Sequence, residues 1–286
     1  MDLIDLKTFI KIAETGSFSA AAEQLHVTQP AVSKRLANLE QTFATPLIER
    51  LPRNARLTEA GKLLKTRAEH IIREVENTQA LIQNLHENVG GTLSIATSHH
   101  IGLHRLPEQI RRFVKDYPEV DFDLRFLASE DAEQAVLNGD VELALMTLPE
   151  TQNPLMEYHT LWHDDLIFVA SKEHPLSTLD TPELKDLTKY RAILPAANTI
   201  TFQKISTIFQ RHQLQLRPSI PTNYLETIKM MVSVGLGWSV LPESMLDSSL
   251  QLLKIGQPLR RELGVIHDTR RMLSRAANAF LKQLEH

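Results

Sequence analysis

The chain has 286 residues, of which 42% are hydrophobic and 23% charged, and its formal net charge is −4. This composition is typical of a globular protein with a hydrophobic core, and the length predicts about one to three domains. The absence of cysteine excludes disulfide bonds, thiolate zinc sites, iron–sulfur clusters and thiol nucleophiles. The sequence has no run of about 18 apolar residues, which a membrane helix requires. Asp2 and Asp5 do not fit a signal peptide, so we expect a cytoplasmic protein.

Two short helices are predicted near the N-terminus. The apolar face of the first consists of Leu3, Leu6, Ile10 and Ala13. Gly16 can end this helix in a left-handed conformation, and Ser17 can cap the next one. The second helix places small side chains, Ala21 and Ala22, beside Leu25. Small side chains allow two helices to approach closely, so we expect these two helices to pack together.

A third helix is predicted within the segment VTQPAVSKRLANLE, residues 27–40, with Val32, Leu36 and Leu39 on its buried face. Thr28 is its predicted N-cap. Pro30 then falls in the first turn, where an amide hydrogen has no partner within the helix and proline is tolerated. Glu40 is expected to be an ordinary surface residue. Two short helices, a tight turn and a third helix with polar residues at its front end form the layout of a helix-turn-helix.

The front end of the third helix carries the predicted contacts to double-stranded DNA, namely Thr28, Gln29, Pro30, Ser33 and Lys34. Glutamine can pair with adenine through two hydrogen bonds, whereas serine and lysine can bind bases or phosphates. In a helix-turn-helix these N-terminal residues lie against base edges in the major groove. An ordinary capped surface helix is the alternative interpretation of the same pattern.

Residues 18–64 closely resemble the DNA-binding domain of LysR-type transcriptional regulators. The matching positions are Ala21, Ala22, Leu25, Gln29, Pro30, Ser33, Leu39, Glu40, Pro46, Leu47, Arg50, Arg53, Leu57, Thr58, Ala60 and Gly61. The resemblance implies a winged helix-turn-helix domain over residues 1–58, with the helix-turn-helix itself at about 18–37. Phe43, Ala44 and Ile48 depart from the family pattern at packing positions.

The segment LIERLPRNARL can form a hairpin around residues 52–54, which would be the wing. Arg53 is predicted to contact DNA from this wing, and a solvated turn is the alternative. Residues 34–73 contain nine basic and four acidic side chains, a net charge of +5, which leaves −9 for the rest of the chain. A basic segment joined to an acidic remainder is consistent with a polyanionic partner at one end.

A long linker helix is predicted over residues 59–89, capped by Thr58 and ended by two glycines. Its apolar positions alternate by four and three, as in the seam of a coiled coil, and are Leu64, Ala68, Ile71, Val75, Thr78, Ile82 and Leu85. Roughly 30 residues would give a rod of about 45 Å. The resemblance implies dimerisation through this helix, so we expect a homodimer or homotetramer.

Strands and helices alternate over residues 90–286, which predicts an α/β domain built from two subdomains. The first would comprise residues about 90–161 and 268–286, and the second about 162–267. In the helix predicted at 103–118, Leu106, Ile110, Phe113 and Val114 are expected to point inward. This order of elements resembles the effector-binding regulatory domain of the LysR family and periplasmic binding proteins, with two Rossmann-like subdomains and a cleft between them.

Ligands of open α/β sheets bind beyond the carboxyl ends of strands, near helix N-termini. This rule selects the predicted effector-binding residues, which are Thr97, Ser98, His99, His100, Thr147, Asn198, Thr199, Thr201, Phe202, Thr222 and Asn223. Hydroxyl and amide groups suit a small polar or anionic molecule. The alternative is that they serve as helix caps and turn residues, which favour the same residue types.

Other classes of function have weaker support. His100 and His104 have a metal-ligand spacing, but no HExxH motif accompanies them and no acidic residue lies within that turn, so no metal site or cofactor is predicted. His159 and His163 share this spacing in an extended segment. The sequence contains no GxSxG, P-loop or GxGxxG motif, so no enzyme activity is expected.

The sequence thus predicts a LysR-type regulator whose effector changes the angle between the two subdomains. The alternative is a small-molecule-binding α/β protein whose N-terminal helices serve only as an interaction module.

Overall fold

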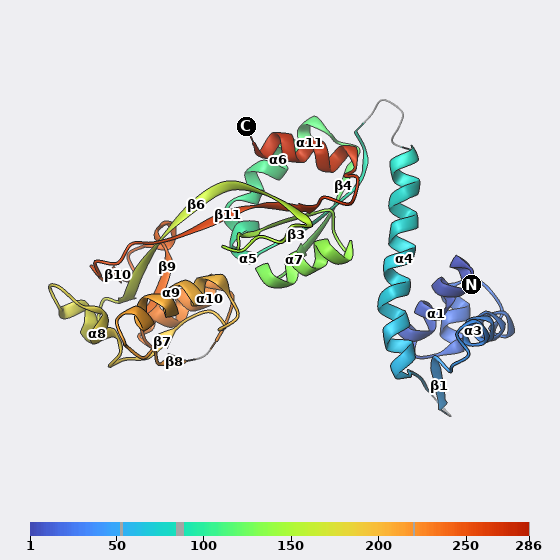
Figure 1. Cartoon of the computed structure of the whole chain (residues 1–286), viewed down its shortest axis with the longest axis horizontal. Helices are drawn as coiled ribbons and strands as arrows, with labels where there is room; N and C mark the ends of the chain where they lie inside the picture. Colours follow the sequence, from blue (N-terminus) through green and yellow to red (C-terminus); the bar gives the residue numbers. More distant parts are fainter. Residues whose placement is uncertain (52–53, 84–88, 220, 286) are drawn as a thin grey trace. The chain divides into compact units, whose positions relative to one another are not determined.

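The computed structural model describes residues 1–51, 54–83, 89–219 and 221–285 (Figure 1). The chain divides into two compact units, Met1–His86 and Glu87–His286. We refer to them as the head unit and the regulatory unit and describe each by itself. None of the helices in the described part of the chain is long and apolar enough to cross a membrane.

The head unit contains four helices and a two-stranded hairpin among its described residues: α1 (Leu3–Thr15), α2 (Phe18–Gln24), α3 (Gln29–Phe43), β1 (Ile48–Leu51), β2 (Asn54–Leu57) and α4 (Glu59–Gln83). Gly16 ends α1 with a φ of 64°, and the Ser17 side chain accepts a hydrogen bond from the Ala20 amide, as predicted. The core also includes Phe9 and Ile12, which the sequence analysis missed on α1. Their burial shows that α1 is covered on more than one face.

The hairpin is joined to the helices by specific hydrogen bonds. Glu40 on α3 was expected to be an ordinary surface residue, and this was wrong, because its Oε1 atom accepts hydrogen bonds from the amides of Leu47 (2.9 Å) and Ile48 (3.3 Å). On the other side, the Ala55 amide donates to the carbonyl of Gly16 at 2.8 Å. These bonds fix the hairpin to the helices at both of its strands.

The linker helix α4 begins as predicted, since Thr58 Oγ1 accepts a hydrogen bond from the Gly61 amide. Close packing explains why residue 61 is a glycine, because a Cβ atom there would lie 2.1 Å from the Leu47 carbonyl oxygen. Part of the predicted seam faces this unit's own core, because Ala68 is fully buried there and Leu64 and Ile71 pack against it. These three positions pack within the chain, and the dimer seam stays a prediction for the remaining ones. Residues 84–88, including Leu85, lie outside the described residues.

The regulatory unit is an α/β structure. Its elements are β3 (Gly91–Thr97), α5 (His99–His104), α6 (Leu106–Asp116), β4 (Val120–Phe126), α7 (Ser129–Asn138), β5 (Leu143–Thr147), β6 (Met156–Ser171), η1 (Pro175–Thr178), α8 (Leu184–Leu187), β7 (Ala192–Ile193), α9 (Ile200–Arg211), β8 (Pro218–Ser219), α10 (Leu225–Ser233), β9 (Ser239–Pro242), η2 (Glu243–Met245), β10 (Leu250–Leu252), β11 (Leu259–Asp268) and α11 (Arg275–Leu284). The alternation of strands and helices agrees with the prediction. Val114 on α6 is an exception, because it is exposed rather than buried.

Two long antiparallel strands, β6 and β11, run through this unit from one end to the other (Figure 1). At one end β11 pairs with β5, which continues to β3 and β4. At the other end β6 pairs with β9 and β10. Separate groups of helices and separate hydrophobic clusters lie at the two ends. This arrangement gives two subdomains joined by the same pair of strands.

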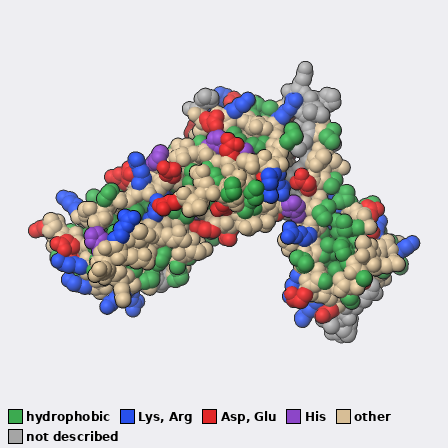
Figure 2. Space-filling view, viewed as in Figure 1, with side chains coloured by type: hydrophobic (Ala, Val, Ile, Leu, Met, Phe, Trp, Pro, Cys, Tyr) green, Lys and Arg blue, Asp and Glu red, His purple; other side chains and the backbone are tan. Residues whose placement is uncertain are grey.

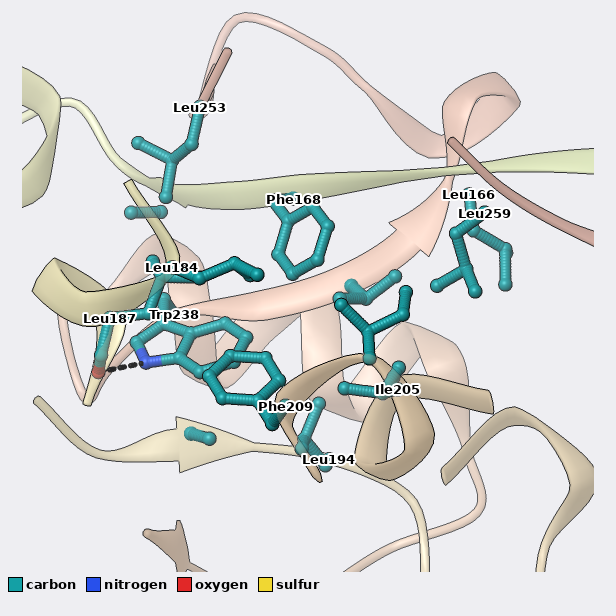
Figure 3. Packing of buried hydrophobic residues seen from close by; sticks show 14 of the residues in the cluster. Leu166, Phe168, Leu184, Leu187, Leu194, Ile205, Phe209, Trp238, Leu253 and Leu259 are labelled. Atoms are coloured by element: carbon teal, nitrogen blue, oxygen red, sulfur yellow. Dashed lines mark hydrogen bonds between the residues drawn. The ribbon is translucent and has the colours of Figure 1, made fainter. Parts of the chain in front are cut away.

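The larger hydrophobic cluster of the second subdomain is centred on Trp238 (Figure 3). Trp238 is fully buried, stacks against Phe209 of α9, and donates a hydrogen bond from Nε1 to the Leu187 carbonyl at 2.9 Å. A buried tryptophan needs such a partner, because an unsatisfied N–H group is costly in an apolar core. The packing fixes α9, whose N-terminus faces the cavity described below.

Candidate functional site

The front end of α3 presents polar side chains on a helix that the core holds from behind. Val32, Leu36 and Leu39 are fully buried, as predicted. On the outer side, Thr28, Gln29, Pro30 and Lys34 are exposed, and Ser33 is partly exposed. Thr28 is the N-cap by position, but its side chain makes no capping hydrogen bond. Gln29 Nε2 lies 3.5 Å from Ser33 Oγ. The two residues proposed to read bases are therefore neighbours on one helical face. Arg53 lies outside the described residues.

A cavity of about 600 Å³ lies between the two subdomains of the regulatory unit. Residues from the ends of β3 and β5 and the start of α7 line one side of it, and residues around the starts of α9 and α10 line the other. The predicted residues found in its wall are Ser98, His99, His100, Thr147, Thr199, Thr201, Thr222 and Asn223. The fold thus brings together side chains that are more than 100 residues apart in the sequence.

Three residues predicted for the effector site do not line this cavity. Thr97 is completely buried, and its hydroxyl donates to the Ser98 carbonyl. Phe202 packs against the hydrophobic cluster around Trp238, because the first turn of α9 turns its side chain inward. Asn198 is exposed, and its carbonyl accepts a hydrogen bond from the Gln203 side chain.

Some lining residues also serve the local fold, as the alternative interpretation stated. Thr199 caps α9 by accepting a hydrogen bond from the Phe202 amide at 3.2 Å. Asn223 Oδ1 accepts from the Ala196 amide at 3.0 Å. Ser98 differs from both, because it is the N-cap of α5 by position and its side chain makes no capping hydrogen bond.

An acidic residue that was not predicted from the sequence reaches across the cavity. Glu130, at the start of α7 in the first subdomain, accepts a hydrogen bond through Oε1 from the Ile200 amide at 3.3 Å. Ile200 is the first residue of α9 in the second subdomain. The amide groups at a helix N-terminus favour negative charge. Glu130 therefore places a carboxylate where a ligand's carboxylate could bind.

A buried charge cluster forms the floor between the subdomains. Arg261 on β11 donates from Nη2 to Asp164 Oδ2 on β6 at 2.8 Å, and Arg105 donates from Nη2 to Asp164 Oδ1 at 3.1 Å. Arg261 also donates from Nη1 to Thr201 Oγ1 at 3.4 Å. Burial alone would raise the pKa of Asp164, but its interactions with His100 and Arg261 outweigh this and hold it well below the ordinary value. Burial lowers the pKa of the Arg261 guanidinium, against the opposing effect of Asp164.

Arg261 lines the cavity, and the sequence carried a signal for it. Leu259, Arg261 and Leu263 alternate with exposed residues along β11, which places the arginine on the inward face of a strand. A cation at an inward position of an alternating strand needs a buried acid as partner. The acid was not predictable from the sequence, because Asp164 lies 97 residues earlier.

Comparisons with known proteins identify the family of this chain. Residues 3–62 match the model of the bacterial regulatory helix-turn-helix protein of the lysR family, and residues 86–286 match the LysR substrate binding domain. The chain belongs to the LysR family of transcriptional regulators. It is a DNA-binding transcriptional regulator with an effector-binding domain, and the family is not one of enzymes.

Relatives and solved structures agree with this assignment. A "Probable RuBisCO transcriptional regulator" of Nostoc sp. is 32% identical over 99% of this chain and 87% of its own length. Full-length CbnR, crystallised with its target DNA, superposes with a TM-score of 0.76 at 20% identity, covering 100% of this chain and 99% of that one. The effector binding domain of QuiR, in complex with shikimate, has a TM-score of 0.62 at 22% identity over 68% of this chain and 95% of that one. These two structures share the fold.

Proposed function

We propose that the cavity between the subdomains binds the effector and that the effector is a small polar molecule with a carboxylate group. The observation that carries this proposal is the hydrogen bond from the Ile200 amide to the Glu130 carboxylate across the cavity. This bond supports the proposal, because a carboxylate of the protein itself already lies within hydrogen-bonding distance of the α9 N-terminus. Ser98 and Thr201 supply hydroxyl groups in the same cavity. The regulatory domain spans residues 90–286 in this proposal, with subdomain I at about 90–161 and 268–286.

The effector would act by changing the contact between the subdomains. A ligand carboxylate at the Ile200 amide replaces that of Glu130, so the bond that joins α7 to α9 is exchanged for one to the ligand. A ligand shifts a conformational equilibrium only through its different affinity for the two states. Exchange of this bond would supply such a difference if the ligand held the two subdomains at a separation other than the one that the Glu130 bond sets.

A thermal-shift screen of small mono-, di- and tricarboxylates on the full chain tests the proposal, because a ligand of the folded state raises the melting temperature. For a ligand so found, Ser98→Ala and Thr201→Ala should each weaken binding by about 0.5–1.5 kcal/mol, the net contribution of one hydrogen bond. Thr207→Ala is the matched control, since Thr207 is exposed on α9 and bonded to the Gln203 carbonyl. If Ser98→Ala and Thr201→Ala bind the ligand with the same affinity as the unaltered chain and the Thr207→Ala control, this cavity is not the effector site.

For the head unit, we propose that Thr28, Gln29, Pro30, Ser33 and Lys34 contact the operator and that Arg53 contacts phosphate from the wing. Thr28, Gln29, Pro30 and Lys34 are exposed and Ser33 is partly exposed, which supports this assignment. Gln29 and Ser33 would contact base edges, because they lie together at the leading end of α3. The winged helix-turn-helix domain would then comprise residues 1–58.

We further propose that the linker helix, residues 59–89, joins two copies of the chain through its second half. Ile82 supports this assignment, because it belongs to the predicted seam and is 61% exposed within a single chain. Ile82→Asp should place like charges across the seam and halve the mass measured by light scattering. Thr66→Asp, on an exposed position of α4 outside the seam, should leave the mass unchanged. An unchanged mass for Ile82→Asp would contradict the proposed interface.

A further inference from the structure

At the edge of the effector cavity, whose wall includes His100, the fold assembles a cluster of possible metal ligands. His100 and His104 lie one turn apart on α5, in the first subdomain. The sequence offered no acidic residue within that turn. The fold supplies one, because Glu226 at the start of α10, in the second subdomain, lies 122 residues from His104 in sequence and in direct contact with it.

The ligand atoms of these three side chains converge. His104 Nε2 lies 2.9 Å from Glu226 Oε1, and His100 Nδ1 lies 4.0 Å from the same oxygen. All three atoms lie within 4.8 Å of one another. Ligands of a tetrahedral zinc ion are about 2.0–2.2 Å from the metal, so neighbouring ligand atoms are roughly 3.3 Å apart by the same geometry. Small side-chain movements would bring the three atoms to such distances.

His100 is the residue that distinguishes this cluster from a chance surface grouping. It is only 5% exposed, and neither ring nitrogen has a hydrogen-bond partner within the described residues. Its Nδ1 atom faces Glu226, and its Nε2 atom lies 3.5 Å from Asp164 Oδ2. Metal-binding histidines characteristically present the second ring nitrogen to a carboxylate, which fixes the ring and its tautomer. Asp164 is suited to that role, because Arg261 and Arg105 hold it in place.

We propose that His100, His104 and Glu226 bind a divalent transition-metal ion between the two subdomains. Two imidazoles and one carboxylate suit Zn²⁺ and its neighbours Co²⁺ and Ni²⁺, whereas Mg²⁺ and Ca²⁺ prefer oxygen ligands alone. His99 lies beside the group, with its Nδ1 atom 3.5 Å from the other carboxylate oxygen of Glu226, Oε2. This revises the sequence-based expectation that the chain has no metal site, and it does not depend on the identity of the effector.

A metal ion at this position would join α5 to α10 and thus one subdomain to the other. The ion can contact all three ligands only when α5 and α10 are close together. Its binding therefore stabilises the conformation in which these two helices are close. The ion would therefore act on the same equilibrium as the effector, from the edge of the same cavity. Such coupling between two ligands is reciprocal, so each would change the affinity for the other by the same factor.

The test is the number of Zn²⁺ ions bound by untagged, chelator-treated full-length protein, measured by calorimetric titration and repeated with Co²⁺ by its absorption spectrum. His104→Ala and Glu226→Gln should each bind one ion fewer than the unaltered protein. These positions are partly exposed, so the variants should keep their fold, as checked by circular dichroism. His100→Ala is avoided because that side chain is buried.

A second group of possible ligands provides the control. Glu157, His159 and His267 also place three ligand atoms within 4.8 Å of one another, on β6 and β11. His159→Ala should leave the ion at His104 in place. The proposal is overturned if the unaltered protein binds no ion, or if His104→Ala and Glu226→Gln bind as many ions as it does. Loss in both variants, with retention of that ion in His159→Ala, supports it.

Discussion

The polar side chains at the tip of α3 and those around the cavity are used in opposite ways. At the α3 tip, within the described residues, the Thr28 side chain makes no capping hydrogen bond and Gln29 Nε2 lies 3.5 Å from Ser33 Oγ. Around the cavity, Arg261 is bonded to Asp164 and Thr201, and Glu130 to the Ile200 amide. The tip of α3 thus leaves these polar groups exposed, whereas the cavity holds Arg261 and Glu130 in hydrogen bonds to other groups of the protein.

The difference has consequences for binding. Exposed side chains on a rigid helix favour DNA binding, because no hydrogen bond within the protein must be broken before they contact bases and phosphates. In a regulatory cavity, internal pairs allow a ligand to change the conformation. A ligand that replaces one partner of a pair breaks the bond between the two elements that the pair had joined. The visible face of the regulatory unit carries acidic and basic side chains interspersed (Figure 2). Its specificity is thus expected to come from the cavity rather than from this surface.

The largest effect is expected from Asp164→Ala. This change leaves the buried Arg261, together with Arg105, without its acidic partner. Removal of one member of a buried ion pair costs about 3–5 kcal/mol, so the regulatory unit should unfold at much lower urea concentration. Tryptophan fluorescence is a suitable probe, because both tryptophans of the chain, Trp162 and Trp238, belong to this unit.

The neighbouring residue provides a matched control. Asp165 pairs with Arg260 across the same two strands, but both side chains are about 60% exposed. Exposed pairs contribute about 0–1 kcal/mol, so Asp165→Ala should shift the urea midpoint little. If both variants lose the same stability, burial does not distinguish the two pairs, and the contrast between internal and exposed polar groups is incorrect.

A smaller effect, on binding alone, is expected from Gln29→Ala. Loss of a base contact should weaken binding to the cognate operator by about 1–3 kcal/mol and leave binding to scrambled duplex nearly unchanged. Gln41→Ala, at an exposed position near the other end of α3, is the control and should change neither affinity. Affinities for both duplexes over a salt series provide the measurement. Equal weakening on cognate and scrambled DNA would mean that the tip of α3 only positions the protein.

The same salt series distinguishes Gln29 from Arg53. Arg53→Ala should weaken both affinities alike and reduce the salt dependence, because each phosphate contact releases counterions from the DNA. An unchanged slope for Arg53→Ala would remove this residue from the DNA contacts.

The head unit was predictable from the sequence in detail because its signals are local. Gly16, Ser17 and Thr58 each define a helix end through their own conformation or a hydrogen bond to a residue three positions away. The errors came from long-range contacts. The role of Glu40 depends on amides seven and eight residues later, and the burial of Ala68 depends on α4 lying against the head core.

The cavity was predictable only in its general position. The rule that ligands bind at the carboxyl ends of strands located eight of its lining residues, because it follows from topology. Which side chains meet across the cavity depends on how the two subdomains close on each other. Glu130 and Glu226 were missed for this reason, since their partners lie 70 and 122 residues away.

The smallest effects are expected from a pair of helix caps, Ser17 and Thr28, in the same unit. Ser17→Ala removes a capping bond and should cost about 1 kcal/mol of stability. Thr28→Ala removes no capping bond, so its effect should stay within about 0.5 kcal/mol. Amide hydrogen exchange of residues 1–47 in the full-length protein measures both, because it reports local opening free energies. Thr28→Ala should nevertheless weaken operator binding, whereas Ser17→Ala should not at temperatures where the head is folded. If Thr28→Ala destabilises the head as much as Ser17→Ala, then Thr28 is a structural cap, and its exposure at the tip of α3 gives no reason to assign it to DNA.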